Sequence, residues 1–231
     1  MKSCLKIIQI SCKEIYFALI VFLIGFTSCN SHKENWTHFR GDNLNGIALT
    51  DAVPLNWSES DIKWKTEIHD RGWSSPVVYN NQVWVTTAKA DGRSLYALCI
   101  DFKTGKVIYD ILVFTPDSVF KKHNVNSYAT PTPCIEKDFI YVNYGSLGTA
   151  CISTTKGSVV WQRTDFTCDY MTYGPGSSPV IYKNLLILHF EGTDSTYIVA
   201  LNKANGELVW RTDRPKEIYD KRPPIGRKAY T

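Results

Sequence analysis

The sequence predicts an all-β protein, a β-propeller of four-stranded antiparallel blades. Three observations predict it. A phrase of two apolar segments around a polar turn recurs as "ALCIDFKTGKVIY" (97–109), "ACISTTKGSVVW" (150–161) and "ALNKANGELVW" (200–210). Each phrase follows another pair of strand-like segments, and long helical patterns are absent. A period of about 50 residues is typical of solenoids, propellers and arrays, and four short strands per unit favour a propeller.

The polar turn of each phrase ends in glycine, at Gly105, Gly157 and Gly206, which are 52 and 49 residues apart. Two β-rich segments around a short polar loop with glycine indicate a hairpin. Glycine supplies the positive φ that such a loop needs at little steric cost. An aromatic residue follows each glycine by four positions, and we therefore expect one ring to point the same way in every unit: Tyr109, Trp161 and Trp210.

The first half of each unit is also repeated. It reads "SSPVVYNNQVWV" (74–85), "TPCIEKDFIYV" (132–142) and "SSPVIYKNLLIL" (177–188), each with a proline before an apolar strand. A β-sandwich with accidental similarity is the alternative, but prolines, glycines and rings all recur in register, which favours the propeller. The expected core takes two strands from each unit: Val77, Val78, Val83, Val85, Ile135, Ile140, Val142, Val180, Ile181, Leu186 and Leu188.

The turn phrase resembles the tryptophan-docking repeat of pyrroloquinoline-quinone-type (PQQ-like) β-propellers, which runs Ala-x-Asp-x-x-x-Gly-x-x-x-Trp in outline. The stretch "ENWTHFRGDNLNG" (34–46) resembles the N-terminal segment of bacterial envelope proteins with this propeller. The resemblance covers about residues 34–231 and extends to outer-membrane assembly lipoproteins of the BamB kind, which hold no quinone. It implies structural docking roles for the three rings and glycines. It also implies one for Asp101, which Ser153 and Asn202 replace in the other copies.

The first 28 residues predict a lipoprotein signal peptide. Three lysines precede the uncharged apolar run "IYFALIVFLIGF" (15–26), which is too short to span a membrane. The following "FTSCN" resembles a lipobox, so we expect Cys29 to be lipidated. An ordinary signal peptide cleaved nearby, or an uncleaved anchor, is the alternative. The predicted parts are the signal peptide (1–28), a tether with an N-terminal segment (29–56) and a partial propeller (57–231).

Charge and cysteine content agree with a cell-envelope protein, lipid-anchored to the outer membrane or a periplasmic face. The formal charge of +4 includes three lysines and one glutamate in the leader, and the near balance elsewhere argues against a nucleic-acid partner. Cys4, Cys12 and Cys29 belong to the leader or lipobox. Cys99 and Cys151 occupy equivalent strand positions, where we expect unbridged cysteines, and the pairing of Cys134 and Cys168 is left open.

The sequence offers no catalytic, cofactor-binding or metal-binding set. Resemblance to quinone-dependent dehydrogenases would imply calcium, an aspartate base and often a Cys-Cys pair, yet the sequence has no Cys-Cys pair and its acidic residues are scattered. Phosphate-loop, nucleophile-elbow and zinc-protease motifs are absent. His189 lies in a strand pattern, where a structural histidine is favoured over a ligand. We therefore expect no cofactor, and the sequence leans against an enzyme.

Two functional readings follow. The first is a non-catalytic envelope lipoprotein whose propeller is an interaction scaffold for an unidentified protein partner. The alternative is a quinone-dependent dehydrogenase-like enzyme or module with its site residues in other blades. Propellers have about 4–8 blades, whereas this sequence shows about three and an orphan N-terminal strand around Trp64. We therefore expect an incomplete ring, from a truncated gene product or a fragment.

Overall fold

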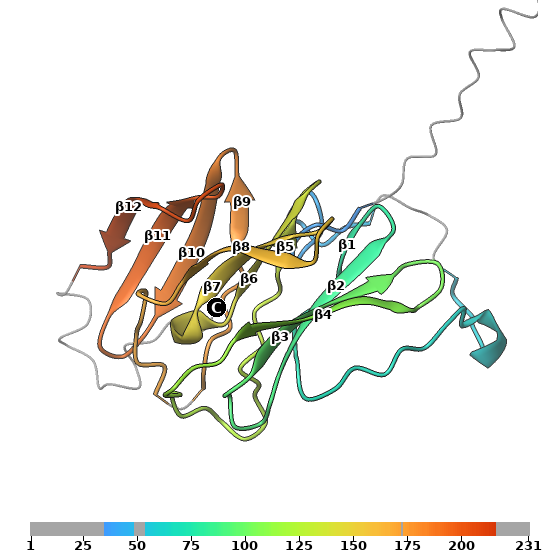
Figure 1. Cartoon of the computed structure of the whole chain (residues 1–231), viewed down its shortest axis with the longest axis horizontal. Helices are drawn as coiled ribbons and strands as arrows, with labels where there is room; N and C mark the ends of the chain where they lie inside the picture. The colour runs from blue at the N-terminus through green and yellow to red at the C-terminus, as the bar shows by residue number, and fades with distance from the viewer. Residues whose placement is uncertain (1–34, 49–53, 172, 216–231) are drawn as a thin grey trace, which may run out of the picture. The chain divides into compact units, whose positions relative to one another are not determined.

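The computed structural model describes residues 35–48, 54–171 and 173–215, so the predicted signal peptide and Cys29 lie outside the described residues. The chain divides into the compact units Met1–Lys33 and Glu34–Thr231, and every described residue belongs to the second. Within the described ranges the strands form three separate four-stranded sheets, and helix is limited to the short 3₁₀ turns η1 (Glu59–Asp61) and η2 (Gly145–Leu147) (Figure 1). No helix of the described residues is long and apolar enough to cross a membrane.

Each sheet is one propeller blade, built from four consecutive antiparallel strands. Blade 1 contains β1 (Val77–Tyr79), β2 (Gln82–Ala88), β3 (Leu95–Asp101) and β4 (Val107–Phe114). Blade 2 contains β5 (Cys134–Ile135), β6 (Phe139–Asn143), β7 (Thr149–Ser153) and β8 (Ser158–Arg163). Blade 3 contains β9 (Val180–Tyr182), β10 (Leu185–Glu191), β11 (Thr196–Asn202) and β12 (Leu208–Asp213). The predicted all-β, incomplete propeller is confirmed.

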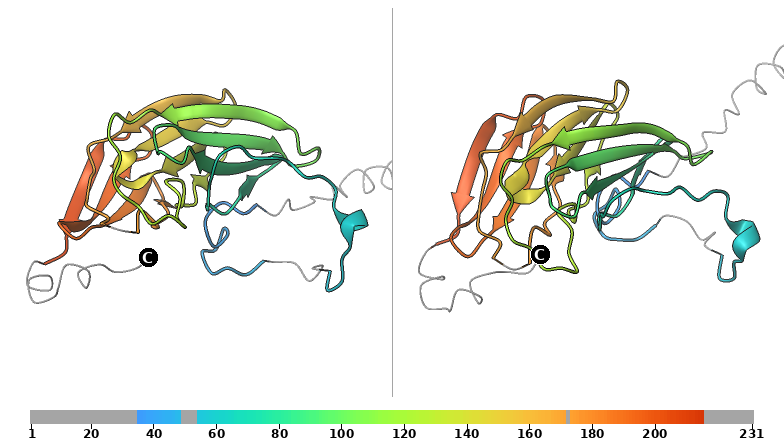
Figure 2. Two further views of the ribbon diagram at one scale, coloured as in Figure 1. Left: turned by 90° about the horizontal axis from the view of Figure 1, so that it is seen from below. Right: turned by 60° about the horizontal axis from the view of Figure 1, so that its bottom comes forward.

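Blade 2 lies between the other two blades, and apolar clusters join it to both (Figures 1 and 2). Strand pairing sets one residue of each strand in a row across the blade face, which we call the forward row. The rows are Val77, Trp84, Cys99 and Tyr109; Cys134, Tyr141, Cys151 and Trp161; and Val180, Ile187, Ala200 and Trp210. In blades 1 and 2 the first three residues of the row are buried, because the next blade covers them.

The expected core is correct for seven positions and wrong for four. Val77, Val83, Ile135, Ile140, Val142, Leu186 and Leu188 are buried, whereas Val78, Val85, Val180 and Ile181 are only half-buried. Val78 and Val85 lie on the face of blade 1 that has no described blade behind it. Val180 lies in the forward row of blade 3, which has no described blade in front of it. Ile181 packs against the cluster between blades 2 and 3 but is not fully covered by it. Apolar patterning identifies strands, but full burial of Val78, Val85 and Val180 also requires a neighbouring sheet.

The expected orphan N-terminal strand makes no sheet ladder with the described strands. Residues 62–69 have no strand assignment, and one isolated β-bridge, between Arg71 and Ala88, follows the segment. Its Trp64 nevertheless packs on Gly105 of blade 1 and donates a 2.9 Å hydrogen bond from Nε1 to the Phe102 carbonyl. The segment therefore contributes its ring without adding a paired strand.

Candidate functional site

The repeated turns join each blade to a ring from the preceding segment. The amide of Gly105 donates to the Asp101 carbonyl, and Gly157 and Gly206 do the same to Ser153 and Asn202, at 2.8–2.9 Å. All three glycines have φ between +62° and +74°. This left-handed backbone favours glycine. The repeat therefore produces the same five-residue turn in each blade.

A side-chain oxygen at the first turn position holds the turn closed. Asp101 Oδ1 accepts the Thr104 hydroxyl and amide, both at 2.8 Å, and the Lys103 amide at 3.1 Å. These bonds, the Thr104 hydroxyl first, hold the pKa of Asp101 below its ordinary value. Ser153 Oγ and Asn202 Oδ1 each accept one backbone amide of their own turns. The acidic residue is thus replaceable, because the turn needs only a short acceptor.

Each ring lies on the turn glycine of the following blade. Tyr109 packs on Gly157 and donates its hydroxyl to the Thr155 carbonyl at 2.9 Å. Trp161 packs on Gly206 and donates Nε1 to the Lys203 carbonyl at 3.0 Å. A Cβ on Gly206 would come within 2.8 Å of the Trp161 ring, so only glycine lets the indole lie this close.

Trp64 and Trp210 are the two ends of this docking series. Trp64 occupies the turn of blade 1, a role that the sequence analysis did not predict. Trp210 is 39% exposed, and its ring has no turn to contact within the described residues. Tyr109, Trp161 and Trp210 thus hold equivalent positions in their blades, but only the first two have a described partner blade.

Three consecutive residues of the N-terminal segment connect the first strands of all three blades. Trp36 exchanges two 2.8 Å backbone bonds with Val78 of β1, and the Thr37 carbonyl accepts the Ile135 amide of β5 at 3.0 Å. His38 Nε2 then accepts the Ile181 amide of β9 at 3.4 Å. The strand amides in these bonds belong to Val78, Ile135 and Ile181. Each of them is the second residue of the first strand of its blade. The segment therefore ties the blades together along their first strands.

His38 accepts this bond only in its neutral form. Its Nδ1 lies 2.8 Å from the Thr37 hydroxyl, which in turn donates to Asp42 Oδ1 at 2.8 Å. These partners assign the ring proton to Nδ1 and leave Nε2 as the acceptor. Burial lowers the pKa of His38, and the negative charges of Asp42 and Glu136 offset part of that effect. The neutral form is thus the one that the fold requires.

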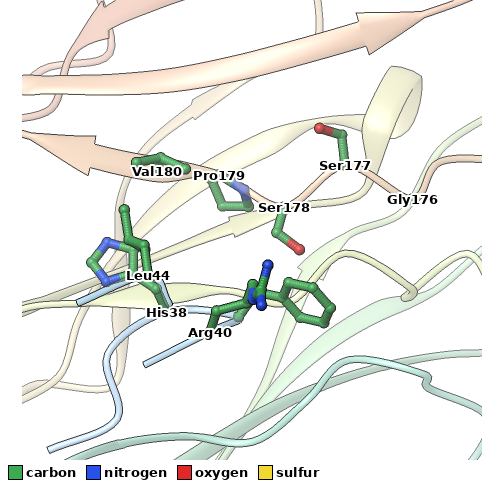
Figure 3. Close-up of a pocket in the computed structure, with 9 residues that line it drawn as sticks. His38, Arg40, Leu44, Gly176, Ser177, Ser178, Pro179 and Val180 are labelled. Atoms are coloured by element: carbon green, nitrogen blue, oxygen red, sulfur yellow. The ribbon is translucent and has the colours of Figure 1, made fainter. Parts of the chain in front are cut away.

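A pocket of about 350 Å³ lies between this N-terminal segment and the entry to β9 (Figure 3). Its walls are mostly apolar and include Phe39, Leu44, Pro179 and Val180. Figure 3 shows the side chains of Arg40 and Ser178 pointing toward one another across it. Arg40 is the one charged side chain among the described lining residues unless His38 is protonated.

The described wall of this pocket does not fit pyrroloquinoline quinone. A quinone with several carboxylates needs several convergent cations and amides, whereas the described wall of this pocket offers Arg40. Arg40 Nη2 is itself bonded to the Asn45 carbonyl at 3.2 Å. Within the described ranges, His, Cys, Asp and Glu side chains form no group of three that could hold a metal ion.

The four described cysteines are buried, and none of them is in a disulfide. Burial raises the pKa of Cys99 and of Cys151 to about 12, and it raises that of Cys134 well above its ordinary value. A thiol with so high a pKa is a poor nucleophile. Cys99 and Cys151 occupy the same place in the forward rows of their blades, where they pack as small apolar groups. These cysteines are therefore structural.

Two histidines lie against carboxylates, and the sequence pattern does not reveal these contacts. His189 Nε2 lies 2.6 Å from Glu191 Oε2, and Arg214 Nη1 lies 2.8 Å from the other carboxylate oxygen, Glu191 Oε1. The structural interpretation of His189 agrees with this buried network. His69 lies between Asp70 (2.7 Å) and Asp110 (3.1 Å). Burial lowers its pKa, but the bonds to both carboxylates outweigh burial and raise it above the ordinary value.

One known structure shares the fold at low sequence identity, and two others match more weakly. The quinohemoprotein alcohol dehydrogenase from Comamonas testosteroni matches with a TM-score of 0.55 and 17% identity, over 78% of this chain and 27% of its own. A europium-containing methanol dehydrogenase matches with a TM-score of 0.47 and 14% identity, over 62% of this chain and 25% of its own. BamB from Moraxella catarrhalis matches with a TM-score of 0.39 and 15% identity, over 63% of this chain and 36% of its own. The chain thus spans between 25% and 36% of the lengths of these proteins.

No curated protein sequence matches the chain. A family model described as "Outer membrane protein assembly factor BamB" matches residues 50–222. This range includes all three blades and Trp64, and therefore most of the docking series described above. Because the match covers more than half of the chain, the protein belongs to the family of outer membrane protein assembly factor BamB.

Proposed function

We propose that this protein is a non-catalytic lipoprotein of the cell envelope whose propeller acts as an interaction scaffold. One observation carries the proposal: the residues of the repeated motif are used to join blades. Tyr109 and Trp161 contact turns, the turn glycines admit the rings, and Asp101 closes its turn. The described pocket between the N-terminal segment and β9 has no convergent set of reactive groups. Function is argued from such sites, not from the fold.

A titration with pyrroloquinoline quinone and calcium separates the scaffold from the alternative, a quinone-dependent enzyme or module. We expect no saturable quench of tryptophan fluorescence and no dye reduction with simple alcohols or sugars. A quinone-dependent dehydrogenase in the same assay serves as the positive control. A tight, stoichiometric quench would contradict the scaffold and favour the enzyme, although the fold likeness to a quinohemoprotein at 17% identity does not itself argue for either.

The family description supports an envelope location, and the lipobox supports an anchor at Cys29. Acyl chains anchor through about 0.8 kcal/mol per buried CH₂, and two or more chains make the attachment lasting. Labelling with palmitate should therefore mark the full-length chain, and Cys29→Ser should abolish both labelling and partition with membranes. Cys12→Ser, also within the leader region, is the matched control and should be labelled normally. Labelling that survives Cys29→Ser would refute the anchor.

A further inference from the structure

Three loops that connect the blades meet at one surface. They precede β1, join β4 to β5, and join β8 to β9. We call their exposed cluster the inter-blade loop patch and define it by six residues: Arg71, Trp73, Lys122, His123, Val125 and Tyr173. The patch lies at the opposite end of β4 from the turn that ends in Gly105, so the blade-docking contacts do not use it.

Hydrogen bonds between the loops hold these side chains in place. Trp73 Nε1 donates to the Val125 carbonyl at 2.9 Å, and Arg71 Nη1 donates to the Asn124 carbonyl at 3.1 Å. The Asn126 side chain donates to the Tyr173 carbonyl. The His123 ring stacks on that of Tyr173, with ring centroids 6.3 Å apart and planes 19° apart. The patch is therefore one connected surface built from segments about 50 residues apart.

The patch exposes apolar area that the fold does not use. Trp73 is 55% exposed, Val125 68% and Tyr173 41%. Exposed apolar patches of this kind on folded proteins commonly mark binding surfaces. Tryptophan, tyrosine and arginine are also the residues that contribute most to protein–protein interfaces. The rings need no rearrangement to present a contact surface, because the loop bonds already orient them.

Two cations of the patch have no carboxylate partner among the described residues. Neither Arg71 nor Lys122 forms an ion pair with a described carboxylate, and Lys122 Nζ donates to the Asn126 carbonyl at 2.8 Å. Burial lowers the pKa of Lys122, and the nearby charge of Arg71 lowers it further. An incoming negative charge would be stabilised by both cations. The patch therefore complements an anionic group placed next to an apolar one.

We propose that the inter-blade loop patch binds a partner-protein segment that presents an acidic side chain beside an apolar or aromatic one. The proposal deepens the scaffold function and rests on it. A membrane surface fits less well, because lipid recognition by charge takes clusters of about four to eight Lys and Arg residues. The patch has two such cations, with Lys121 as an exposed neighbour. The ring positions of the patch are fixed, and it has two cations. Such a surface matches the ordered side chains of a protein segment better than a fluid layer of lipid headgroups.

Nuclear magnetic resonance of the ¹⁵N-labelled protein tests this with the unlabelled peptide GSEFDWEGS. The indole N–H signal of Trp73, assigned with Trp73→Phe, should shift saturably as peptide is added. The indole of Trp161, which lies on the Gly206 turn, is the internal control and should not move. The shift should weaken with added salt, because exposed ion pairs are screened. The peptides GSKFKWKGS and GSESDSEGS should each bind at least about fivefold more weakly.

A double variant tests the cations. Arg71→Ala with Lys122→Ala should weaken binding of GSEFDWEGS about fivefold to tenfold. Lys103→Ala with Lys156→Ala removes the same charge from exposed turns at the other end of the blades and should leave binding unchanged. An unchanged Trp161 indole signal in both variants will show that the blades are still packed.

Several results would overturn the proposal. They are the absence of a saturable Trp73 shift, equal shifts with the basic peptide, or equal losses in the two double variants. Sedimentation with phosphatidylglycerol vesicles that requires Arg71 and Lys122, without a peptide response, would assign the patch to lipid instead. The quinone titration does not involve this patch, so the scaffold function and the docking surface can fail separately.

Discussion

Replacing Gly206 with alanine should lower the free energy of unfolding by about 3 kcal/mol. Gly206 has φ = +74°, and a Cβ there would lie 2.8 Å from two atoms of the Trp161 ring. The change therefore has two separate costs. One is left-handed backbone strain, and the other is displacement of the indole from the turn, with loss of its bond to the Lys203 carbonyl.

The two costs are estimated independently. A non-glycine residue in the left-handed region costs about 1–2 kcal/mol. Overpacking against a ring costs about 1–3 kcal/mol, and the lost hydrogen bond belongs to this second cost. Gly46→Ala is the matched control. Its φ is +75°, and the nearest atom to its Cβ is the flexible Arg40 Nε at 3.3 Å, so it should lose the strain cost alone.

Urea unfolding followed by tryptophan fluorescence measures both variants. Gly206→Ala should lose more stability than Gly46→Ala, by about 1–3 kcal/mol. Equal losses in the two variants would show that the indole does not depend on a bare glycine. A Gly206→Ala protein within about 0.5 kcal/mol of the parent, the range of an ordinary surface substitution, would refute the docking argument entirely.

Three further predictions follow from the same contacts. The lowered pKa of Asp101, held mainly by the Thr104 hydroxyl, gives stability that is present above its unfolded pKa of about 3.9 and lost as pH falls through the folded value. Asp101→Asn should flatten that loss in melts between about pH 5 and 2. Because the pKa of His38 is lowered in the folded protein, stability should be lost as the pH falls from about 6.5 toward that lowered pKa. His38→Gln should remove this pH dependence in melts that begin at about pH 6.5 and go lower. Trp161→Ala should cost about 2–4 kcal/mol, whereas Trp210→Ala, at a ring 39% exposed, should cost under about 1 kcal/mol, as measured by urea unfolding.

The docking residues were accessible from the sequence because they repeat. A glycine that must take positive φ, followed by a ring at a constant offset, leaves a periodic trace in Gly157 and Trp161. Trp64 could be related to the same series, although its segment lacks the rest of the repeat. The target of each ring was not accessible, because each ring bonds to a turn that lies 38 to 46 residues further along the chain.

The surface patch and the N-terminal connection left little trace in the sequence. Arg71, Lys122 and Tyr173 belong to three loops with no common motif, and only chain packing brings them together. His38 appeared as an isolated histidine, and its bond to β9 spans 143 residues. Local patterns report local conformation, so contacts between distant loops do not appear in them.

The sequence by itself determined the blades. Apolar alternation, turn glycines and ring offsets act through backbone conformation and pairing between adjacent strands, which are short-range effects. The tertiary structure decided which apolar faces are buried. Val77 and Val180 hold equivalent places in the forward rows, yet Val77 is fully buried and Val180 only half-buried. Likewise, Tyr109 lies on the next blade whereas Trp210 is 39% exposed. Burial and docking depend on a neighbouring sheet, and no single repeat encodes whether that neighbour is present.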